Sequence, residues 1–226
     1  MNILVLAAHP DDEVLGCGAT IAKLADEKHD VFIAILGEGI TSRYQDREKV
    51  DKSLLRGIQD CSRNAAGILN AKDVFFYDLP DNRFDTVPLL EVIKIIEDLA
   101  GKVEPDIVFT HHGGDLNIDH VIVHRATLTA LRPVSKKVIS RICSYEVPSS
   151  TEWAFNQFEP YFRPNMFVDV SNTLERKIEA IKAYDTEIRQ FPHPRSPEAL
   201  RSIANRWGST AGLEAAEAFE IIRLVC

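Results

Sequence analysis

The chain has few cysteines, no long apolar run and no block of basic residues. Its four cysteines lie far apart, without a C-x-x-C pair, at Cys17, Cys61, Cys143 and Cys226. This spacing predicts reduced, mostly buried thiols and indicates neither a disulfide framework nor a thiolate zinc site. No apolar run approaches the roughly 18 residues of a membrane span, and "MNILVLAA" lacks the basic region of a signal peptide. We therefore expect a cytoplasmic protein without a membrane span.

The charge and composition narrow the class of protein further. A net charge of −8 argues against a nucleic-acid partner, because binding phosphates requires a concentrated basic surface. Apolar residues make up 45% of the chain and charged residues 27%, as in ordinary soluble globular proteins. The 226 residues fit one domain. We expect a single domain over 1–226, with a regular core at 1–145 and a less regular part at 146–226.

Apolar runs and helical spacings alternate along the first 145 residues. Continuous apolar runs predict strands at 3–7, 31–36, 74–77, 106–110 and 138–144, with helices between them at about 14–28, 45–70, 88–101 and 118–131. Gly101 is suited to a helix C-cap. The remainder predicts a strand at 166–170, helices at about 173–190 and after Ser196, and a final apolar segment. This alternation predicts an α/β, Rossmann-like three-layer fold with a mostly parallel sheet.

The common nucleotide and hydrolase motifs of such sheets are missing. "GCGATI" (16–21) lacks the third glycine of a dinucleotide fingerprint and lies beyond the turn where a phosphate would bind. Close packing of the helix on the sheet explains its small residues better. There is also no P-loop and no G-x-S-x-G nucleophile elbow.

Polar clusters instead follow four of the predicted strands. The sequence "HPDD" follows the first strand, Glu38 the second, "DNR" (81–83) the third, and the stretch from His111 to His120 the fourth. Ligands of parallel sheets bind at the carboxyl ends of the strands, so these four loops converge at one edge.

Imidazole and carboxylate groups in these clusters are good zinc ligands. A catalytic zinc keeps three protein ligands and one position for water, which the His9 and His120 clusters can supply. As an alternative, Asp11 and Asp12 are a helix N-cap and a first-turn acid. That alternative leaves His9 and the second cluster unexplained, so we favour the metal site.

The segment from Ala8 to Glu13 resembles the A-H-P-D-D-E motif of the LmbE-like, or PIG-L, deacetylases. These zinc-dependent enzymes remove acetyl groups from N-acetylglucosaminyl compounds. Their second motif, H-P-D-H, appears here as Asn-Ile-Asp-His at 117–120. The resemblance, which covers residues 1–145, implies zinc ligands and a general base, namely His9, Asp12 and His120 for zinc and Asp11 for the base. Asp119 would then hold an imidazole in its metal-binding tautomer or orient another group of the site.

Asn117 departs from the family pattern, which usually has histidine there. A histidine can stabilise an oxyanion as a cation, whereas Asn117 donates only a neutral amide hydrogen bond. His111, His112 and His193 are candidates to help, with surface or packing roles as the alternative. Prolines on both sides of His193 stiffen "FPHPRS" (191–196). This loop would cap the site from its own chain or from a neighbouring subunit of a homo-oligomer.

The resemblance also implies that sugar contacts come from the loops after the second and third strands. The candidate substrate-binding residues are Glu38, Asp81, Asn82 and Arg83, together with His112 and His193. Arg43 or Arg56 would bind an anionic aglycone, and a solvated surface role stays open for each arginine.

The sequence therefore predicts a zinc-dependent hydrolase that removes an acetyl group from an N-acetylated amino sugar or its conjugate. The alternatives are a non-catalytic metal- or sugar-binding module of the same fold, for which Asn117 is the reason, and a nucleotide-binding Rossmann enzyme.

Overall fold

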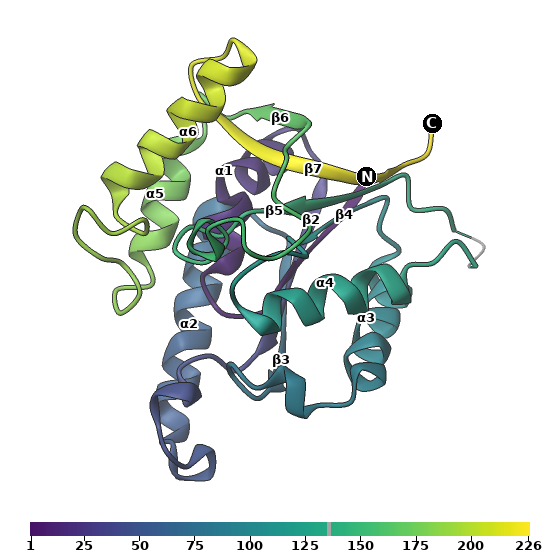
Figure 1. The fold of residues 1–226 in the computed structure, drawn as a ribbon, viewed down its shortest axis with the longest axis vertical. Helices are drawn as coiled ribbons and strands as arrows, with labels where there is room; N and C mark the ends of the chain where they lie inside the picture. Colours follow the sequence, from purple (N-terminus) through teal and green to yellow (C-terminus); the bar gives the residue numbers. More distant parts are fainter. Residues whose placement is uncertain (135–136) are drawn as a thin grey trace.

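A central sheet lies between two layers of helices in the computed structural model, which describes residues 1–134 and 137–226 (Figure 1). Within these ranges seven strands form one sheet in the order β3-β2-β1-β4-β5-β7-β6. Strands β1 to β5 are parallel to one another, and β7 is antiparallel to both β5 and β6. The bounds are β1 (Asn2–Ala7), β2 (Asp30–Gly37), β3 (Asp73–Leu79), β4 (Ile107–His111), β5 (Arg141–Tyr145), β6 (Met166–Asp169) and β7 (Ala216–Leu224). The predicted α/β fold with a mostly parallel sheet is confirmed.

The helices cover both faces of the sheet, and successive side chains of β1 pack against one helix layer and then the other. Ile3 and Val5 join a core with α1, α2 and α5, whereas Leu4 and Leu6 join a core with α3 and α4. Both faces of β1 are buried, so its sequence is continuously apolar. The helices are α1 (Asp12–Asp26), α2 (Lys52–Leu69), α3 (Leu89–Val103), α4 (Ile118–Ala130), α5 (Leu174–Lys182) and α6 (Pro197–Ala211), with short 3₁₀ turns η1 (Thr41–Arg43), η2 (Arg47–Lys49), η3 (Phe84–Thr86) and η4 (Glu152–Ala154).

Several predicted element ends were wrong, because apolar spacing does not locate the caps. The helix expected from residue 45 begins at Lys52, where the Asp51 side chain accepts a hydrogen bond from Ser53 N. The helix expected to reach residue 190 ends at Lys182. Gly101 lies inside α3, and Glu104 caps that helix in a left-handed conformation. The final apolar segment is strand β7.

Helix α1 packs tightly on the sheet at Gly16, as the "GCGATI" segment predicted. A Cβ atom on Gly16 would lie 2.1 Å from Cδ2 of Tyr145, so no larger residue fits there. The Tyr145 hydroxyl donates a 2.7 Å hydrogen bond to the Leu6 carbonyl. This contact links β5 to β1 beside helix α1.

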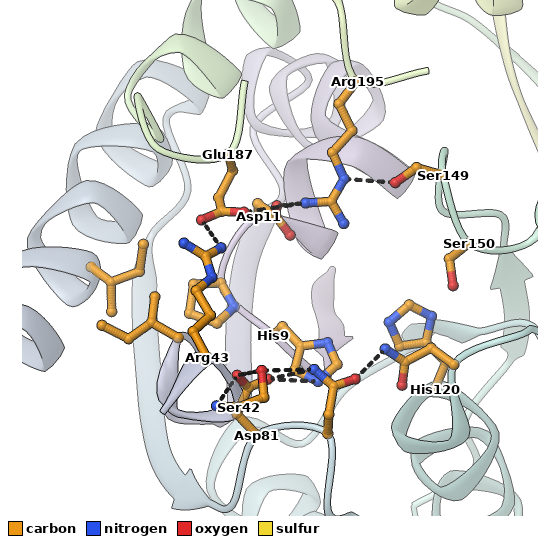
Figure 2. Close-up of a pocket in the computed structure, with 16 residues that line it drawn as sticks. His9, Asp11, Ser42, Arg43, Asp81, His120, Ser149, Ser150, Glu187 and Arg195 are labelled. Atoms are coloured by element: carbon orange, nitrogen blue, oxygen red, sulfur yellow. Dashed lines mark hydrogen bonds and ion pairs between the residues drawn. The ribbon is translucent and has the colours of Figure 1, made fainter. Parts of the chain in front are cut away.

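From β1 the chain proceeds through β2 and β3 toward one edge of the sheet, and it then returns to add β4 and β5 on the other side of β1. The carboxyl ends of β1 and β4 therefore lie at a topological switch point. The C-terminal part of the chain returns to this place. After α5, the loop that connects to α6 brings residues near 187 and 195 beside the start of α1 (Figures 1 and 2). None of the helices in the described ranges combines the length and apolarity needed to cross a membrane.

Candidate functional site

A cavity of about 230 Å³ opens at the carboxyl ends of β1 to β5. Its lining is mostly polar and comes mainly from the loops after β1, β2, β3, β4 and β5 and from the α5–α6 connection, with His120 of α4 and Ile58 of α2 (Figure 2). The lining side chains include His9, Asp11, Ser42, Arg43, Asp81, Asn82, Asn117, His120, Ser149, Ser150, Glu187 and Arg195. Six segments that are distant in sequence therefore meet in one pocket.

His9, Asp12 and His120 form the candidate metal centre on one side of this pocket. Oδ2 of Asp12 lies 3.3 Å from Nδ1 of His9 and 3.3 Å from Nε2 of His120. One ligand atom from each residue lies within 4.8 Å of the others. Two imidazoles and one carboxylate are the donor set of several catalytic zinc sites, so these residues fit a divalent metal ion.

Two further carboxylates fix the tautomers of the two imidazoles. Asp119 Oδ2 lies 2.9 Å from Nε2 of His9, and Asp115 Oδ1 lies 3.1 Å from Nδ1 of His120. An ionised carboxylate only accepts hydrogen bonds, so these ring nitrogens carry the protons. In the neutral imidazoles the lone pairs then lie on Nδ1 of His9 and Nε2 of His120, on the side of Asp12. Such carboxylate–imidazole pairs are typical of metal-binding histidines.

A second group of potential ligands, His9, Asp81 and Asp119, lies on the other side of the His9 ring. Oδ1 of Asp81 lies 3.5 Å from Nε2 of His9, and Oδ2 of Asp81 accepts hydrogen bonds from Ser42 N and Oγ at 3.0 and 2.7 Å. Because Nε2 donates to Asp119 at 2.9 Å, it has no lone pair for a metal. The first group is therefore the better metal centre.

The carboxylates around His9 and His120 give the candidate metal centre a negative charge that a bound cation would neutralise. Burial opposes protonation of His120, but the carboxylates of Asp12 and Asp115 outweigh it and raise its pKa to about 9. The pKa of His9 is raised as well, because Asp119 and Asp12 outweigh the effect of burial. Although burial favours protonation of Asp12, the facing imidazoles hold its pKa well below the ordinary value. The carboxylates thus hold more negative charge than neutral imidazoles balance, as a site for a divalent cation requires.

Asp11 lies beside the metal centre in a constrained conformation. Its φ of 103° is a left-handed backbone state that residues other than glycine rarely adopt. Its backbone N–H donates to Oε2 of Glu13 at 3.1 Å, and Arg195 Nη1 donates to its Oδ2 at 2.7 Å. Burial raises the pKa of Asp11 to about 7, against the lowering effect of Arg195. A carboxyl group with such a pKa can accept and return a proton near neutral pH.

Asn117 is half-buried at the N-terminus of α4, and its side chain forms hydrogen bonds through both of its polar atoms. Its Oδ1 accepts from Asp119 N at 2.9 Å, which is an N-cap, and its Nδ2 donates to Asn82 Oδ1 at 2.9 Å. The side chain also lines the pocket, so Nδ2 has a second hydrogen available there. Asn117 is therefore placed both to cap α4 and to contact a ligand.

Four of the predicted substrate-binding residues do not line the cavity. Glu38 binds the Arg47 guanidinium, and Arg83 is exposed in the turn after β3. His112 is buried with Nε2 2.7 Å from Pro160 O, and His193 packs edge-on against Trp153. By contrast, Asp81 and Asn82 line the pocket, as does Arg43.

His111 also lies outside the pocket, stacked behind the ring of His120 at a centroid distance of 4.0 Å. Its Nε2 accepts a hydrogen bond from Ala8 N at 2.8 Å. Burial, with His120 adding to the effect, lowers the pKa of His111 well below its ordinary value. None of the three histidines proposed to assist Asn117 therefore faces the cavity.

Asp115, Glu187 and Arg195 contact the residues of this site but were not predicted from the sequence. Asp115 lies in the loop that was expected to carry chemistry, but no motif marks it. Arg195 belongs to the "FPHPRS" loop, whose stiffness indicated a role, although His193 was the residue singled out. Glu187 was placed inside a predicted helix and gave no signal.

Comparisons with known proteins agree with this geometry. The model of the PIG-L family, described as GlcNAc-PI de-N-acetylase, matches residues 4–131. An uncharacterised deacetylase of Escherichia coli K12, YaiS, is 30% identical over 66% of this chain and 75% of its own length. The diacetylchitobiose deacetylase of Thermococcus kodakarensis is 26% identical over 98% of this chain and 83% of its own.

The fold is shared with proteins of other activity. The crystal structure of GalB, the 4-carboxy-2-hydroxymuconate hydratase of Pseudomonas putida KT2440, has a TM-score of 0.78 and 21% identity, and the match covers 100% of this chain and 98% of that one. The fold alone therefore does not fix the reaction, and the function has to be argued from the site.

Proposed function

This chain belongs to the PIG-L family of de-N-acetylases, and we propose that it is a zinc-dependent hydrolase that removes the acetyl group from an N-acetylated amino sugar or its conjugate. One observation supports this most strongly. The metal-facing nitrogens of His9 and His120 and the carboxylate of Asp11 open into the same small polar pocket. Metal-assisted hydrolysis of an amide uses a metal site and a base side by side.

His9, Asp12 and His120 would hold the zinc ion. When bound there, zinc supplies a water of lowered pKa and polarises the amide carbonyl. Asp119 and Asp115 keep the two imidazoles in the tautomers that this role requires.

Asp11 acts as the general base in this proposal. It takes a proton from the attacking water and returns it to the nitrogen of the departing amine, so that acetate and a free amino sugar are formed. Among the described residues Oδ1 of Asp11 has no hydrogen-bond partner, whereas Oδ2 is bound by Arg195. Oδ1 is thus the oxygen available for proton transfer.

Asn117 would donate its second Nδ2 hydrogen to the oxyanion of the tetrahedral intermediate. Asp81, Asn82 and Ser42 would bind sugar hydroxyls from the opposite wall of the pocket. The cavity of about 230 Å³ accommodates one sugar ring with its acetamido group and leaves an aglycone outside.

The test is acetate release from a panel of N-acetylglucosamine glycosides, measured together with zinc content. Zinc-loaded wild type should release one acetate per free amine formed, and chelation should abolish this activity. Asp11→Asn should keep zinc and lose about 10²–10⁴-fold in kcat. His9→Ala, Asp12→Ala and His120→Ala should lose zinc, because each removes one of three protein ligands.

Two results would contradict the proposal. A zinc-replete protein that binds these sugars and releases no acetate from any of them is a binding module. Wild-type zinc content in all three alanine variants would show that these residues do not bind the metal.

A further inference from the structure

We propose that Arg195 is a positioning residue for Asp11: its guanidinium fixes one carboxylate oxygen so that the other faces the pocket. This inference rests on the proposed function in taking Asp11 as the general base. The contact is a 2.7 Å hydrogen bond from Nη1 to Oδ2 across 184 residues of sequence. Figure 2 shows the guanidinium lying between Asp11 and Ser149 at the rim of the pocket.

Arg195 is held rigidly enough to orient another side chain. Its Nε donates to Ser149 Oγ at 2.8 Å, and its backbone N–H donates to Nδ1 of His193 at 3.1 Å. The next residue, Ser196, is buried and caps α6 through a 3.1 Å hydrogen bond from Ala199 N to its Oγ. The Arg195 backbone is thus fixed next to the start of a helix. Its guanidinium is fixed at Nε by Ser149 and at Nη1 by Asp11.

A second arginine leaves Arg195 free for Asp11. Glu187 is the competing carboxylate, with its Oε2 3.5 Å from Nη1 of Arg195. Its other oxygen, Oε1, binds Nη2 of Arg43 at 2.5 Å. Glu187 therefore pairs mainly with Arg43. Arg195 lies closer to Asp11 than to Glu187 and pairs mainly with Asp11.

The two ends of Asp11 are fixed by different groups. Glu13 accepts the Asp11 backbone N–H at 3.1 Å and supports the left-handed backbone, whereas Arg195 fixes the carboxylate. A base must lie within hydrogen-bond reach of the proton that it takes, and misplacement by about 1 Å costs on the order of 10²-fold in rate. Without Arg195 the carboxylate could rotate away from this position.

The kinetic test compares Arg195→Met, Arg195→Lys and Arg189→Met in their zinc-loaded forms. Arg195→Met should lose about 10–100-fold in kcat with less than about a threefold change in KM, because the base is misplaced while the sugar contacts remain. Arg195→Lys should recover part of the loss. Arg189 is exposed on the same connection and, among the residues that the structure describes, donates to the carbonyls of Thr186 and Ile188 alone, so Arg189→Met should match wild type.

Chemical rescue separates positioning from support of the fold. Guanidinium chloride at tens of millimolar should raise the kcat of Arg195→Ala severalfold and saturably, whereas sodium chloride at equal ionic strength should not. A kcat of Arg195→Met within about threefold of wild type overturns the proposal, as does a loss that guanidinium and Arg195→Lys both fail to reverse.

A melting experiment tests the contact independently of activity. Arg195→Met leaves the buried Asp11 carboxylate unpaired, so it should lower Tm by at least about 3 °C more in wild type than in the Asp11→Asn background. Additive Tm losses overturn the proposal. If wild type releases no acetate, the proposed function fails, and this cycle still decides whether Arg195 holds Asp11.

Discussion

Asp119 Oδ2 lies 2.9 Å from Nε2 of His9, on the side of the ring that faces away from Asp12. The same carboxylate accepts the backbone N–H of Phe84 through Oδ1 at 2.9 Å. Asp119 is therefore oriented by the 3₁₀ turn after β3 and in turn orients an imidazole from the loop after β1. Three segments of the chain are joined by one buried side chain.

Asp119→Asn should weaken metal binding by about 10–100-fold, because an amide no longer fixes the His9 tautomer. The asparagine oxygen can still accept from Phe84 N, so the fold should be retained. Chelator competition measures the affinity, and Asp106→Asn, a carboxylate at the opposite end of the sheet, serves as the control. Unchanged affinity would show that the His9 ring does not need Asp119.

Asp115→Asn should lower metal affinity to a similar extent through His120. Asp115 Oδ1 is 3.1 Å from Nδ1 of that ring, and the carboxylate also accepts from Ser150, Thr151 and Asn117 N. Because these donors orient the carboxylate, the amide that replaces it cannot satisfy all of them. Isothermal titration with zinc provides the measurement, and a wild-type dissociation constant would be the contrary result.

Asn117→Ala and Asn117→Ser separate the two roles of Asn117. Serine is as good an N-cap as asparagine, but it lacks the amide N–H group. If that group binds the oxyanion, both variants should lose up to about 10²–10³-fold in kcat while zinc content stays the same. If Asn117 acts only as a cap, Asn117→Ser should keep full kcat, and Asn117→Ala alone should lose about 1 kcal/mol of stability.

Lys177→Met should destabilise the fold by about 3–5 kcal/mol, because it leaves Glu217 buried without its partner. Lys177 Nζ binds Glu217 Oε1 at 2.6 Å and the Leu15 carbonyl at 2.7 Å, and Glu217 accepts the Ala19 and Thr20 N–H groups of α1. Urea denaturation measures the loss. Arg201→Met, which breaks an exposed pair with Glu175, should cost no more than about 1 kcal/mol.

His124→Asn should reduce the loss of stability in mild acid. Burial lowers the pKa of His124 below its ordinary value of 6.5, so the unfolded chain binds a proton more readily than the folded one. Stability linked to this group is present above pH 6.5 and is lost as the pH falls through the window below it. Asparagine can keep a hydrogen bond to the His111 carbonyl, which Nδ1 of His124 contacts at 2.8 Å. The urea midpoints of wild type and variant are compared at pH 7 and pH 5. If wild type is the more stable of the two at pH 7, the difference between their midpoints should be smaller at pH 5. The same difference at both pH values would contradict this assignment.

The local sequence was sufficient for the fold class and for the clustering of polar loops. A strand buried on both faces must be continuously apolar, and the crossovers of a parallel sheet force its carboxyl ends to one edge. The run from His9 to Asp12 places two candidate metal ligands in a single turn, so the motif itself determines that they are close together. Local sequence patterns did not predict helix ends such as Lys52 and Lys182, because these ends depend on caps and on the tertiary packing of the terminal turns.

Only the tertiary structure decided which side chains support that motif. Asp119 and Asp115 both follow β4, yet one contacts His9 and the other His120, because Asp115 lies in the loop before α4 whereas Asp119 lies in the first turn of that helix. Arg195 reaches Asp11 although it is distant in sequence, and His193, two residues away, points to Trp153 instead. Apolar periodicity encodes burial, whereas the partner of a buried charge is set by where separate segments meet, and no local pattern of residues records that.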